Sequence, residues 1–379
     1  MKMKVVAIKS IADVSSGNTP SRRKSEYWNG SIPWITTGEL ESGYVTASKE
    51  CVTEKALKET ALKLYHKGTV LIAMYGQGKT RGTAAVLGIE ATVNQACAAL
   101  TVHSGCSKFL FYQLQNSYHA IRRLSNTGNQ ENLNAEIIKN FKILWPDELE
   151  QQKIAAILST QDKVIELKEK LLAQKQQQKK YLMQQLLTGK LRLPDVNGEW
   201  TSVKLKELLI ERNEKNVEQN HRICSVAVSK GVVDQIEHLG RSYAAADTSN
   251  YGVAHYGDII YTKSPTGDFS LGIIKQNRMH ENVAISPLYG IYKPISFSTG
   301  YLLNIYFEST INTKNYLTPI VQKGAKNTIA ISNSAFLENK IFFPMDEATQ
   351  SRIAKVFELT DHEIDPVSYT HLRAYETRS

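Results

Sequence analysis

Residues 141–190 read FKILWPDELEQQKIAAILSTQDKVIELKEKLLAQKQQQKKYLMQQLLTGK. After Pro146 this stretch has no further proline, and its only glycine is Gly189, where a helix end is expected. Apolar residues recur every seven positions over about 30 residues, which predicts a coiled-coil face on a long helix. We therefore expect a spacer helix over residues 149–192, roughly 60 Å long. The apolar columns are Ile157, Val164 and Leu171, and beside them Leu158, Ile165 and Leu172.

The sequences on either side of this helix repeat each other with an offset of about 190 to 200 residues. Each half has a glycine followed by an apolar strand, at Gly68 and at Gly257. Each half ends with apolar residues, a proline (Pro146 or Pro344) and an acidic turn, followed by the helix starts QQKIA and QSRIA. The segments between these landmarks are dissimilar. Two copies of the same sequence landmarks, with dissimilar segments between them, predict two related modules that recognise different targets.

Composition narrows the class of protein. The chain has 379 residues, enough for two or three domains, with 42% hydrophobic and 22% charged residues. The apolar stretch near the start, Val5–Ile8, is too short for a signal peptide, and no apolar run reaches the roughly 20 residues that span a bilayer. We expect a cytoplasmic protein without a membrane partner. The formal net charge of +9 suits a polyanionic partner such as DNA.

Motifs for an active site are missing from the sequence. The four cysteines form no CxxC pair, and the nine histidines form no HExxH, so we expect no metal and no cofactor. A DNA adenine methyltransferase would need a glycine-rich cofactor loop and a Pro-Pro motif, and neither occurs. We therefore predict that the chain is not an enzyme.

Two stretches imitate catalytic motifs. Residues 73–80, AMYGQGKT, loosely fit a nucleotide-binding P-loop, but a P-loop needs a helix directly after Lys-Thr. Residues 81–88 are instead typical of a turn and a strand, so we interpret this segment as a flexible loop presented to DNA. Asp147, with Glu166 and Lys168, spells a nuclease pattern, but the last two lie on the predicted helix, several turns from Asp147.

Candidate DNA-reading residues come from the polar and basic loops in the dissimilar middles. Arginine pairs with guanine edges and asparagine or glutamine with adenine edges, while lysine contacts phosphates. The alternative for each residue is an ordinary solvated surface charge. The candidates in the first module are Arg22, Arg23, Lys24, Tyr75, Gln77, Lys79 and Arg81. Those in the second are Lys263, Ser264, Thr266, Arg278 and Lys326, together with Asn327.

These residues resemble the specificity subunit of Type I restriction–modification enzymes over nearly the whole chain. One signature is Tyr27-Trp28 followed by IPWIT at residues 32–36. Another is TGNQENL at residues 127–133. The third is Pro146 leading into EQQKIA and the long helix that ends with LLTGK at residues 186–190. Together the three are specific to the family.

The resemblance implies an α+β fold with two similar α/β target-recognition domains in tandem, joined by a long coiled-coil spacer helix. Each domain would read one half of a bipartite double-stranded DNA site. The apolar columns of the helix would bind methyltransferase (M) subunits, and a motor–nuclease (R) subunit would complete the complex. The expected parts are a first recognition domain at 1–148, the spacer helix at 149–192, a second recognition domain at 193–345, the start of a second spacer helix at 346–365, and a non-native tail at 366–379.

The sequence departs from the family pattern at its end. The apolar stripe of the second helix (Ile353, Val356, Phe357, Ile364) stops before Asp365-Pro366, and the remaining residues have no heptad period. A truncated second helix keeps open the alternative of a silent specificity cassette. A second alternative is a coiled-coil repeat adaptor that has no DNA partner.

Overall fold

A computed structural model describes residues 4–76, 78–124, 132–194, 196, 198–241, 244–323 and 329–376. The chain divides into two compact units, Met1–Glu166 and Leu167–Ser379. The boundary between the units falls inside the long helix α5 (Glu148–Leu186). The predicted spacer helix is thus present as one continuous helix, which ends at Leu186 rather than at residue 192. It is followed by Gly189 in the left-handed region (φ 69°), as expected for a helix end.

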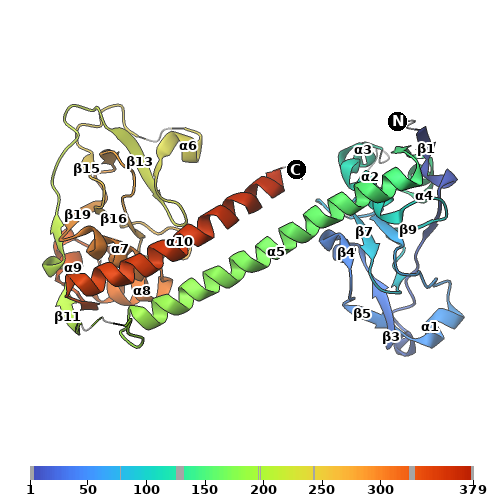
Figure 1. Cartoon of the computed structure of the whole chain (residues 1–379), viewed down its shortest axis with the longest axis horizontal. Helices are drawn as coiled ribbons and strands as arrows, with labels where there is room; N and C mark the ends of the chain where they lie inside the picture. The colour runs from blue at the N-terminus through green and yellow to red at the C-terminus, as the bar shows by residue number, and fades with distance from the viewer. Residues whose placement is uncertain are drawn as a thin grey trace. The chain divides into compact units, whose positions relative to one another are not determined.

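The first unit is built on a five-stranded sheet in the order β2-β9-β6-β7-β4 (Figure 1). These strands are Ala12–Ser16, Cys97–Val102, Val70–Ala73, Ala84–Leu87 and Tyr44–Val45. A three-stranded sheet joins β5 (Glu50–Val52), β3 (Trp28–Ile35) and β8 (Thr92–Val93), and β1 (Lys4–Ala7) pairs with β10 (Lys142–Trp145). The helices are α1 (Glu54–Glu59), α2 (Ser107–Asn116), α3 (Tyr118–Arg123) and α4 (Ala135–Asn140).

The second unit contains a four-stranded sheet in the order β12-β19-β16-β17. These strands are Leu209–Glu211, Gly290–Pro294, Ile259–Tyr261 and Ile274–Gln276. Another sheet orders β14 (Gly231–Asp234), β13 (Arg222–Ala227), β18 (Val283–Ile285) and β15 (Gly252–Ala254), and β11 (Trp200–Lys204) pairs with β22 (Lys340–Pro344). A short pair joins β20 (Gln322–Lys323) and β21 (Ile329–Ala330). The helices are α6 (Gln235–Leu239), α7 (Phe297–Phe307), α8 (Thr310–Leu317), α9 (Asn333–Glu338) and α10 (Glu347–Glu376).

The two units share one strand order, so the predicted repeat is confirmed as a repeat of structure. In both, a strand after the opening 3₁₀ turn pairs antiparallel with a later strand, which pairs with a central hairpin: β2-β9-β6-β7 and β12-β19-β16-β17. The hairpin begins after Gly68 in the first unit and Gly257 in the second, and these glycines have φ angles of 90° and 91°. An α+β architecture with two similar modules and a long helix is therefore what the sequence specifies.

Both central sheets are covered on their two faces, which explains the unbroken apolar runs of their strands. In β6, Val70 and Ile72 belong to the core that contains α2, whereas Leu71 and Ala73 belong to a second core on the other face. Side chains alternate between the faces of a strand, so a strand that is buried on both sides needs apolar residues at every position. The run IIY of β16 obeys the same rule.

A buried glutamine connects each module to its long helix. Gln151 is 1% exposed, donates from Nε2 to the carbonyl of Pro146 at 2.7 Å and accepts the backbone N–H of Cys106 at 2.9 Å. Gln350 is equally buried, donates to the carbonyl of Pro344 at 2.8 Å and accepts the hydroxyl of Thr299 at 2.6 Å. In the first module the amide thus connects the strand–proline turn to the start of α2. In the second it connects the same turn to α7.

A tyrosine and an aspartate form a second repeated contact, three turns further along each long helix. Tyr112 of α2 donates its hydroxyl to Asp162 of α5 at 2.7 Å, and Tyr301 of α7 donates to Asp361 of α10 at 2.8 Å. Burial raises the pKa of Tyr301, so the phenol keeps its proton and remains a donor. The helices α2 and α7 therefore hold the long helix of their own module through the same kind of contact.

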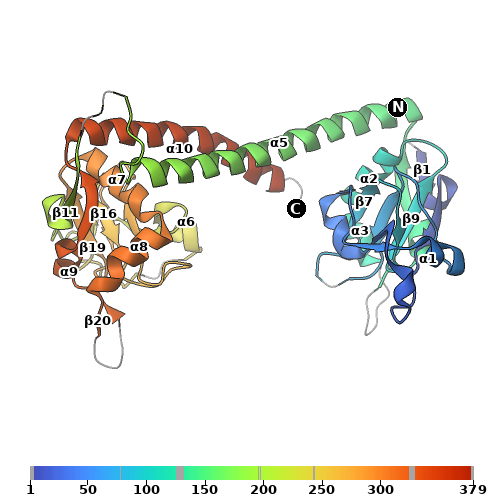
Figure 2. The same cartoon turned by 90° about the horizontal axis from the view of Figure 1, so that it is seen from below.

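The carboxyl-terminal part of α5 packs beside α10 within the second unit (Figure 2). Lys179 lies 2.8 Å from Asp361 and 3.0 Å from Glu308, and Lys175 lies 2.7 Å from Glu363. Burial opposes the charge on Lys179, but the two carboxylates outweigh it, so its pKa is raised and the amine stays charged. Leu186 and Leu187 complete this contact by entering the core of the second unit.

The expectation that the second long helix stops at Asp365-Pro366 is wrong. Helix α10 continues to Glu376, so it extends eleven residues beyond Asp365. A proline removes one N–H from the hydrogen-bond ladder, but the bonds on either side of it can remain, and a helix then bends rather than ends. The end of the apolar stripe therefore does not predict the residue at which the helix ends.

The Gln151→Ala substitution tests the buried junction. It leaves the carbonyl of Pro146 and the N–H of Cys106 buried without the side-chain amide, so we expect the free energy of unfolding to fall by about 2 kcal/mol. Urea denaturation followed by circular dichroism measures this change. Gln152→Ala is the matched control, because Gln152 is exposed and its side-chain amide donates to Glu148 in the preceding turn. Equal, small losses for both variants would contradict the role of Gln151.

Candidate nucleic-acid interface

The loops that carry most of the predicted DNA-reading residues occupy the same place in the two modules. The segment 74–83 connects β6 to β7, and the segment 262–273 connects β16 to β17. These are the central hairpins of the repeated sheet (Figure 1). The structure therefore places three described candidates of each module on one hairpin loop. The first loop holds Tyr75, Lys79 and Arg81, and the second holds Lys263, Ser264 and Thr266.

A second loop of the first module starts from the same sheet edge. Strands β2 and β6 both pair antiparallel with β9, so they run parallel to each other and their chains leave at the same end. The chain that leaves β2 carries Arg22, Arg23 and Lys24, all of them exposed. The predicted cations of this module thus come after two strands that end at one edge.

Glycines and backbone hydrogen bonds shape the loop between β6 and β7. Gly76, Gly78 and Gly82 all have positive φ angles, of 146°, 61° and 86°. The N–H of Ala73 donates to the carbonyl of Thr83, and the carbonyl of Ala73 accepts the N–H of Gly82, so these bonds close the base of the loop. A residue with a Cβ would be strained at these φ angles, so the glycines permit this tight path.

Exposure separates the candidates on this loop. Tyr75 and Lys79 are exposed, whereas Arg81 is only 8% exposed and is buried against the module. The sequence predicts that Arg81 is an exposed cation. In the structure its side chain is buried and does not form part of the accessible surface. Gln77 lies outside the described residues.

Two side chains of α3 contact this loop and were missed from the sequence. Arg122 donates to the carbonyls of Gly78 at 2.8 Å and Arg81 at 2.6 Å. Tyr118 donates its hydroxyl to the carbonyl of Lys79 at 2.6 Å. Nothing local in the sequence indicates these contacts, because their acceptors are backbone atoms about 40 residues away along the chain.

The chain after Thr80 excludes a nucleotide-binding P-loop at residues 73–80. Thr80 leads into a turn and then into strand β7, and no helix starts there. A P-loop needs a helix N-terminus to face the phosphates. The sequence-based interpretation as a loop between two strands is confirmed.

The arginine of the loop after β2 has protein partners. Both terminal nitrogens of Arg22 contact the carboxylate of Glu50, at 2.6 and 2.7 Å, and its guanidinium stacks 3.7 Å from the ring centre of Trp28. A fork that faces a carboxylate is not facing a guanine at the same time. Lys24 donates to the hydroxyl of Tyr27 at 2.9 Å. Arg23, between them, is exposed.

Polar residues at the same edge of the sheet were also missed. Asn18 comes soon after β2, and its carbonyl accepts the ring N–H of Trp34 at 3.0 Å. The next residue, Thr19, hydrogen-bonds to the side chain of Gln95, which is exposed in the turn between β8 and β9. Amide side chains suit adenine edges, so Gln95 joins the candidates of the first module.

The loop of the second module is held by its backbone. Lys263 has a φ of 57°, a left-handed conformation that a residue with a side chain rarely adopts. Gly272 packs so closely that a Cβ there would meet the backbone nitrogens of Lys263 and Ser264 at 2.9 and 3.1 Å. Burial lowers the pKa of Lys263. Strain of this kind often occurs at functional positions, which favours Lys263 among the candidates.

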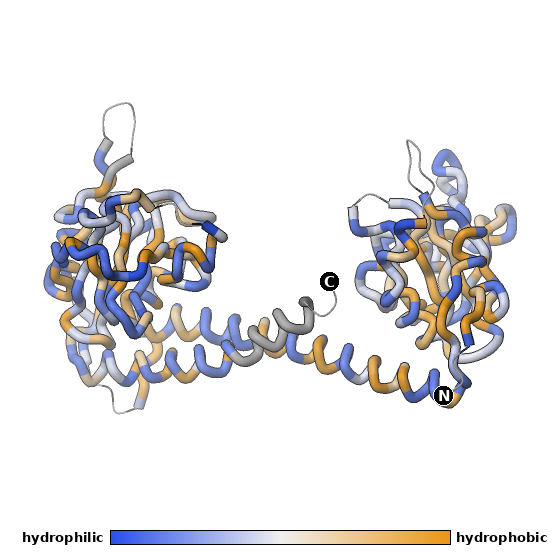
Figure 3. The backbone as a smooth tube through the Cα atoms, turned by 90° about the horizontal axis from the view of Figure 1, so that it is seen from above, coloured by the Kyte–Doolittle hydropathy of each residue, from blue (hydrophilic) through white to orange (hydrophobic). Residues whose placement is uncertain are grey.

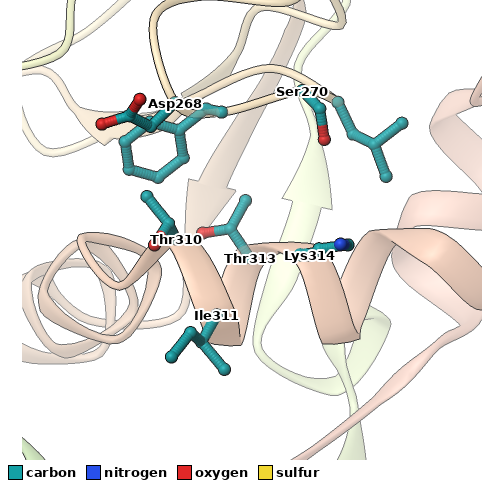
Figure 4. Close-up of a pocket in the computed structure, with 8 residues that line it drawn as sticks. Asp268, Ser270, Thr310, Ile311, Thr313 and Lys314 are labelled. Atoms are coloured by element: carbon teal, nitrogen blue, oxygen red, sulfur yellow. The ribbon is translucent and has the colours of Figure 1, made fainter.

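A small cavity lies beneath this loop. It measures about 160 Å³ and separates the loop from helix α8. Figure 4 shows Thr310 and Thr313 of α8 on the side that faces the loop residues Asp268 and Ser270. Phe269 is buried and anchors the loop to the module between these two polar residues.

The remaining candidates of the second module are not on this hairpin loop. Arg278 comes after β17, at the opposite end of the hairpin from Lys263, since Ile259 of β16 pairs with Gln276 and Tyr261 pairs with Ile274. Its guanidinium lies 4.3 Å from the ring centre of Tyr301 and 4.0 Å from Asp361. Arg278 thus belongs to the contact with α10. Lys326 and Asn327 lie outside the described residues.

The predicted apolar columns of α5 are accessible. Ile157 is 63% exposed, and Ile165 and Leu172 are half-buried. Figure 3 shows apolar residues recurring among polar ones along this helix. Leu158, Val164 and Leu171 are also exposed. Among the described residues, no helix is long and apolar enough to span a membrane, and no group of three metal-ligating side chains is found.

Comparison with known proteins finds similarity over the first part of the chain. Residues 1–176 match the family model of the Type I restriction modification DNA specificity domain. The MjaIX specificity subunit of Methanocaldococcus jannaschii is 34% identical over 172 residues, which cover 44% of this chain and 39% of that subunit. The EcoR124I/EcoR124II specificity subunit of Escherichia coli is 29% identical over 151 residues, or 38% of this chain and 37% of that subunit. The matched region thus spans about two fifths of each relative.

The fold extends the likeness over the whole chain. The crystal structure of the S subunit of a Type I system from M. genitalium aligns with a TM-score of 0.64, at 14% identity, over 100% of this chain and 94% of that one. A chain from a structure of type I restriction–modification complex assembly aligns with a TM-score of 0.52, at 13% identity, over 99% of this chain and 95% of that one. At such identities the likeness shows the fold.

The repeated modules and the long helix belong to the fold that this chain shares with the solved S subunit. Residues 1–176, just under half of the chain, are similar to the DNA specificity domain of Type I restriction–modification systems, in agreement with the resemblance that the sequence predicts. The relatives are named for specificity and not for a catalytic activity, in agreement with the prediction of a non-catalytic subunit.

Two substitutions at one position test the strained lysine. Glycine adopts a φ of 57° without a steric penalty and alanine does not, so Lys263→Gly should be more stable than Lys263→Ala by about 1 kcal/mol. Urea denaturation of both variants measures the difference. Both lose the cation, so charge cancels in the comparison. Equal stabilities, or a more stable alanine variant, would show that the fold does not impose this conformation.

Proposed function

We propose that the chain is the DNA-binding specificity subunit of a Type I restriction–modification complex. Its recognition domains, residues 1–148 and 193–345, each read one half of a bipartite site in double-stranded DNA. The long helices dock methyltransferase subunits, and a motor–nuclease subunit completes the restriction complex. The chain supplies sequence recognition, and its partners supply base flipping, cofactor binding and methyl transfer.

The observation that carries this proposal is the pair of equivalent hairpin loops. The two modules keep the strand order of the sheet and the left-handed glycine before the hairpin, but their loops differ in length and in side chains. The first presents Tyr75 and Lys79, and the second presents Lys263 and Ser264. A constant frame with altered loops is what two readers of different base sequences require, because base edges are read by side chains at fixed positions.

Positive charge supports the same conclusion. The chain carries a net charge of +9, and exposed cations such as Arg23 and Lys79 lie in the loops at the sheet edge. Phosphate contacts of this kind fix the position of a protein on DNA without selecting a sequence. A steep fall of DNA affinity with salt should therefore accompany specific binding, whereas an adaptor without a DNA partner would show none.

The exposed apolar side chains of α5 support docking of the methyltransferase. Soluble proteins rarely leave an apolar stripe along a helix uncovered, and burying one leucine or isoleucine contributes about 1.5–3 kcal/mol. Ile157, Leu158 and Val164 offer such a stripe next to the first module. A methyltransferase docked here would be held on the same module that reads one DNA half-site.

The first experiment is co-expression with the methyltransferase encoded beside this chain, followed by single-molecule sequencing of host DNA for methyladenine. We expect one split motif, fully methylated, that disappears when this chain is omitted. Methylation that does not depend on the chain, or that falls at an undivided motif, would overturn the proposal. Failure of the two proteins to co-purify, with no methylation, would favour the silent cassette instead.

The length of α5 provides a second test. We expect deletion of residues 167–173, one heptad and about 10 Å of helix, to shorten the spacer between the half-sites by up to about three base pairs. Insertion of a second copy of the same heptad should lengthen it. The methylated motifs of both variants, read by the same sequencing, give the spacers directly. An unchanged spacer in a variant that still methylates DNA would show that the helix does not set the distance.

A further inference from the structure

The recognition loop of the first module consists of the described residues of the segment 74–83. Helix α3 binds this loop through the backbone carbonyls of the loop. Three of its carbonyls, those of Gly78, Lys79 and Arg81, accept hydrogen bonds from α3. The donors are Arg122 and Tyr118, which lie one helical turn apart and therefore face the same way.

The two donors also contact each other. The Nη1 of Arg122 lies 3.1 Å from the hydroxyl of Tyr118, and the guanidinium carbon lies 5.2 Å from the centre of its ring. Gly82 completes the fit, since a Cβ at that position would meet Cγ of Arg122 at 3.0 Å and the ring of Tyr118 at 3.6 Å. Arginine, tyrosine and the glycine of the loop thus form one packed contact.

A loop with three glycines at positive φ has many conformations to lose when it binds a ligand. Hydrogen bonds from a charged fork to its carbonyls remove much of that freedom in advance. Preorganisation of this kind raises the affinity for the ligand that fits the held conformation, because less ordering is left for binding to do. It does not raise the affinity for phosphates in general.

We infer that Arg122 and Tyr118 are positioning residues that hold the recognition loop of the first module in the conformation that reads DNA. The inference rests on the proposed function and assigns selectivity for one half-site to residues behind the loop. Their side chains act on Tyr75 and Lys79 through the backbone, and neither needs to touch a base. The loop of the second module is held differently, by Gly272 and Phe269, so the effect is confined to the first half-site.

The Arg122→Lys substitution tests the inference in the complex with the methyltransferase. Lysine keeps the charge but loses the planar fork that reaches two carbonyls at once. We expect specific DNA binding to weaken about tenfold or more, with the salt dependence of non-specific binding unchanged. The methylated motif should become degenerate in the first half and stay unchanged in the second. Arg123→Lys, the same change at the exposed next residue, should leave both halves intact.

Hydrogen–deuterium exchange gives a measurement that needs no DNA. The amides of Gly82 and Thr83 donate to the carbonyls of Ala73 and Thr80, so they should exchange faster in Arg122→Lys than in the wild type or Arg123→Lys. Tyr118→Phe, which removes only the hydroxyl, should shift exchange and half-site selectivity in the same direction by a smaller amount. Should Arg122→Lys fail to fold, Tyr118→Phe carries the test alone.

The outcomes separate the inference from the proposed function. A wild-type complex that binds no split site contradicts the proposed function, whatever the variants do. A wild-type complex that reads a split site, with both variants reading the same first half at wild-type affinity, overturns the positioning role. Loss of selectivity in both halves at once would also overturn it, because the role is confined to the loop of one module.

Discussion

Each module of this protein depends on a junction at which a strand ends, a proline turns the chain and a long helix begins. The amides of Gln151 and Gln350 close these junctions from within the core, each bonding the proline carbonyl in front of the helix. The Tyr112–Asp162 and Tyr301–Asp361 hydrogen bonds repeat the attachment three turns later. Two fixed points on one rigid helix determine both the position and the direction of the helix leaving the module.

Because that attachment is fixed, the opposite end of the central hairpin is free to vary. Strands β6 and β16 are buried on both faces and tolerate only apolar residues, whereas the loops after them carry no such constraint. The two loops are accordingly stabilised in unrelated ways. One relies on Arg122 and Tyr118 from a helix, and the other relies on a close approach between Gly272 and Lys263. A common scaffold can therefore present different surfaces without any change in its core.

The features that the sequence predicts correctly are those with a local or periodic signal. The heptads of α5, the proline–helix junctions and the glycine before an apolar strand in each half all depend on residues within a few turns of one another. The same reasoning rejects a P-loop at Lys79-Thr80, because residues 81–88 have the pattern of a turn and a strand. The repeat itself is visible because these local signals recur in the same order.

Predictions that depend on distant parts of the chain are less successful. Arg22 and Arg81 look equivalent in the sequence, yet Arg22 pairs with Glu50 of strand β5 and Arg81 is buried. The sequence predicts that Arg278 and Lys263 both read DNA, but strand pairing places them at opposite ends of a hairpin. The donors Arg122 and Tyr118 were missed because their acceptors are carbonyls, which every residue has. A pattern of side chains does not indicate which backbone atoms will be bound.

The two halves of α5 show how one heptad pattern serves two purposes. Towards its carboxyl end, Lys175 and Lys179 pair with Glu363 and Asp361 of α10, and Leu186 is buried in the second unit. A partly buried ion pair of this kind contributes little net stability, but it penalises any register that leaves a charge unpaired. Nearer its amino end, Ile157 and Val164 remain exposed. The charged half thus fixes the register of the helix within the chain itself, and the apolar half leaves a surface on which a partner gains binding energy.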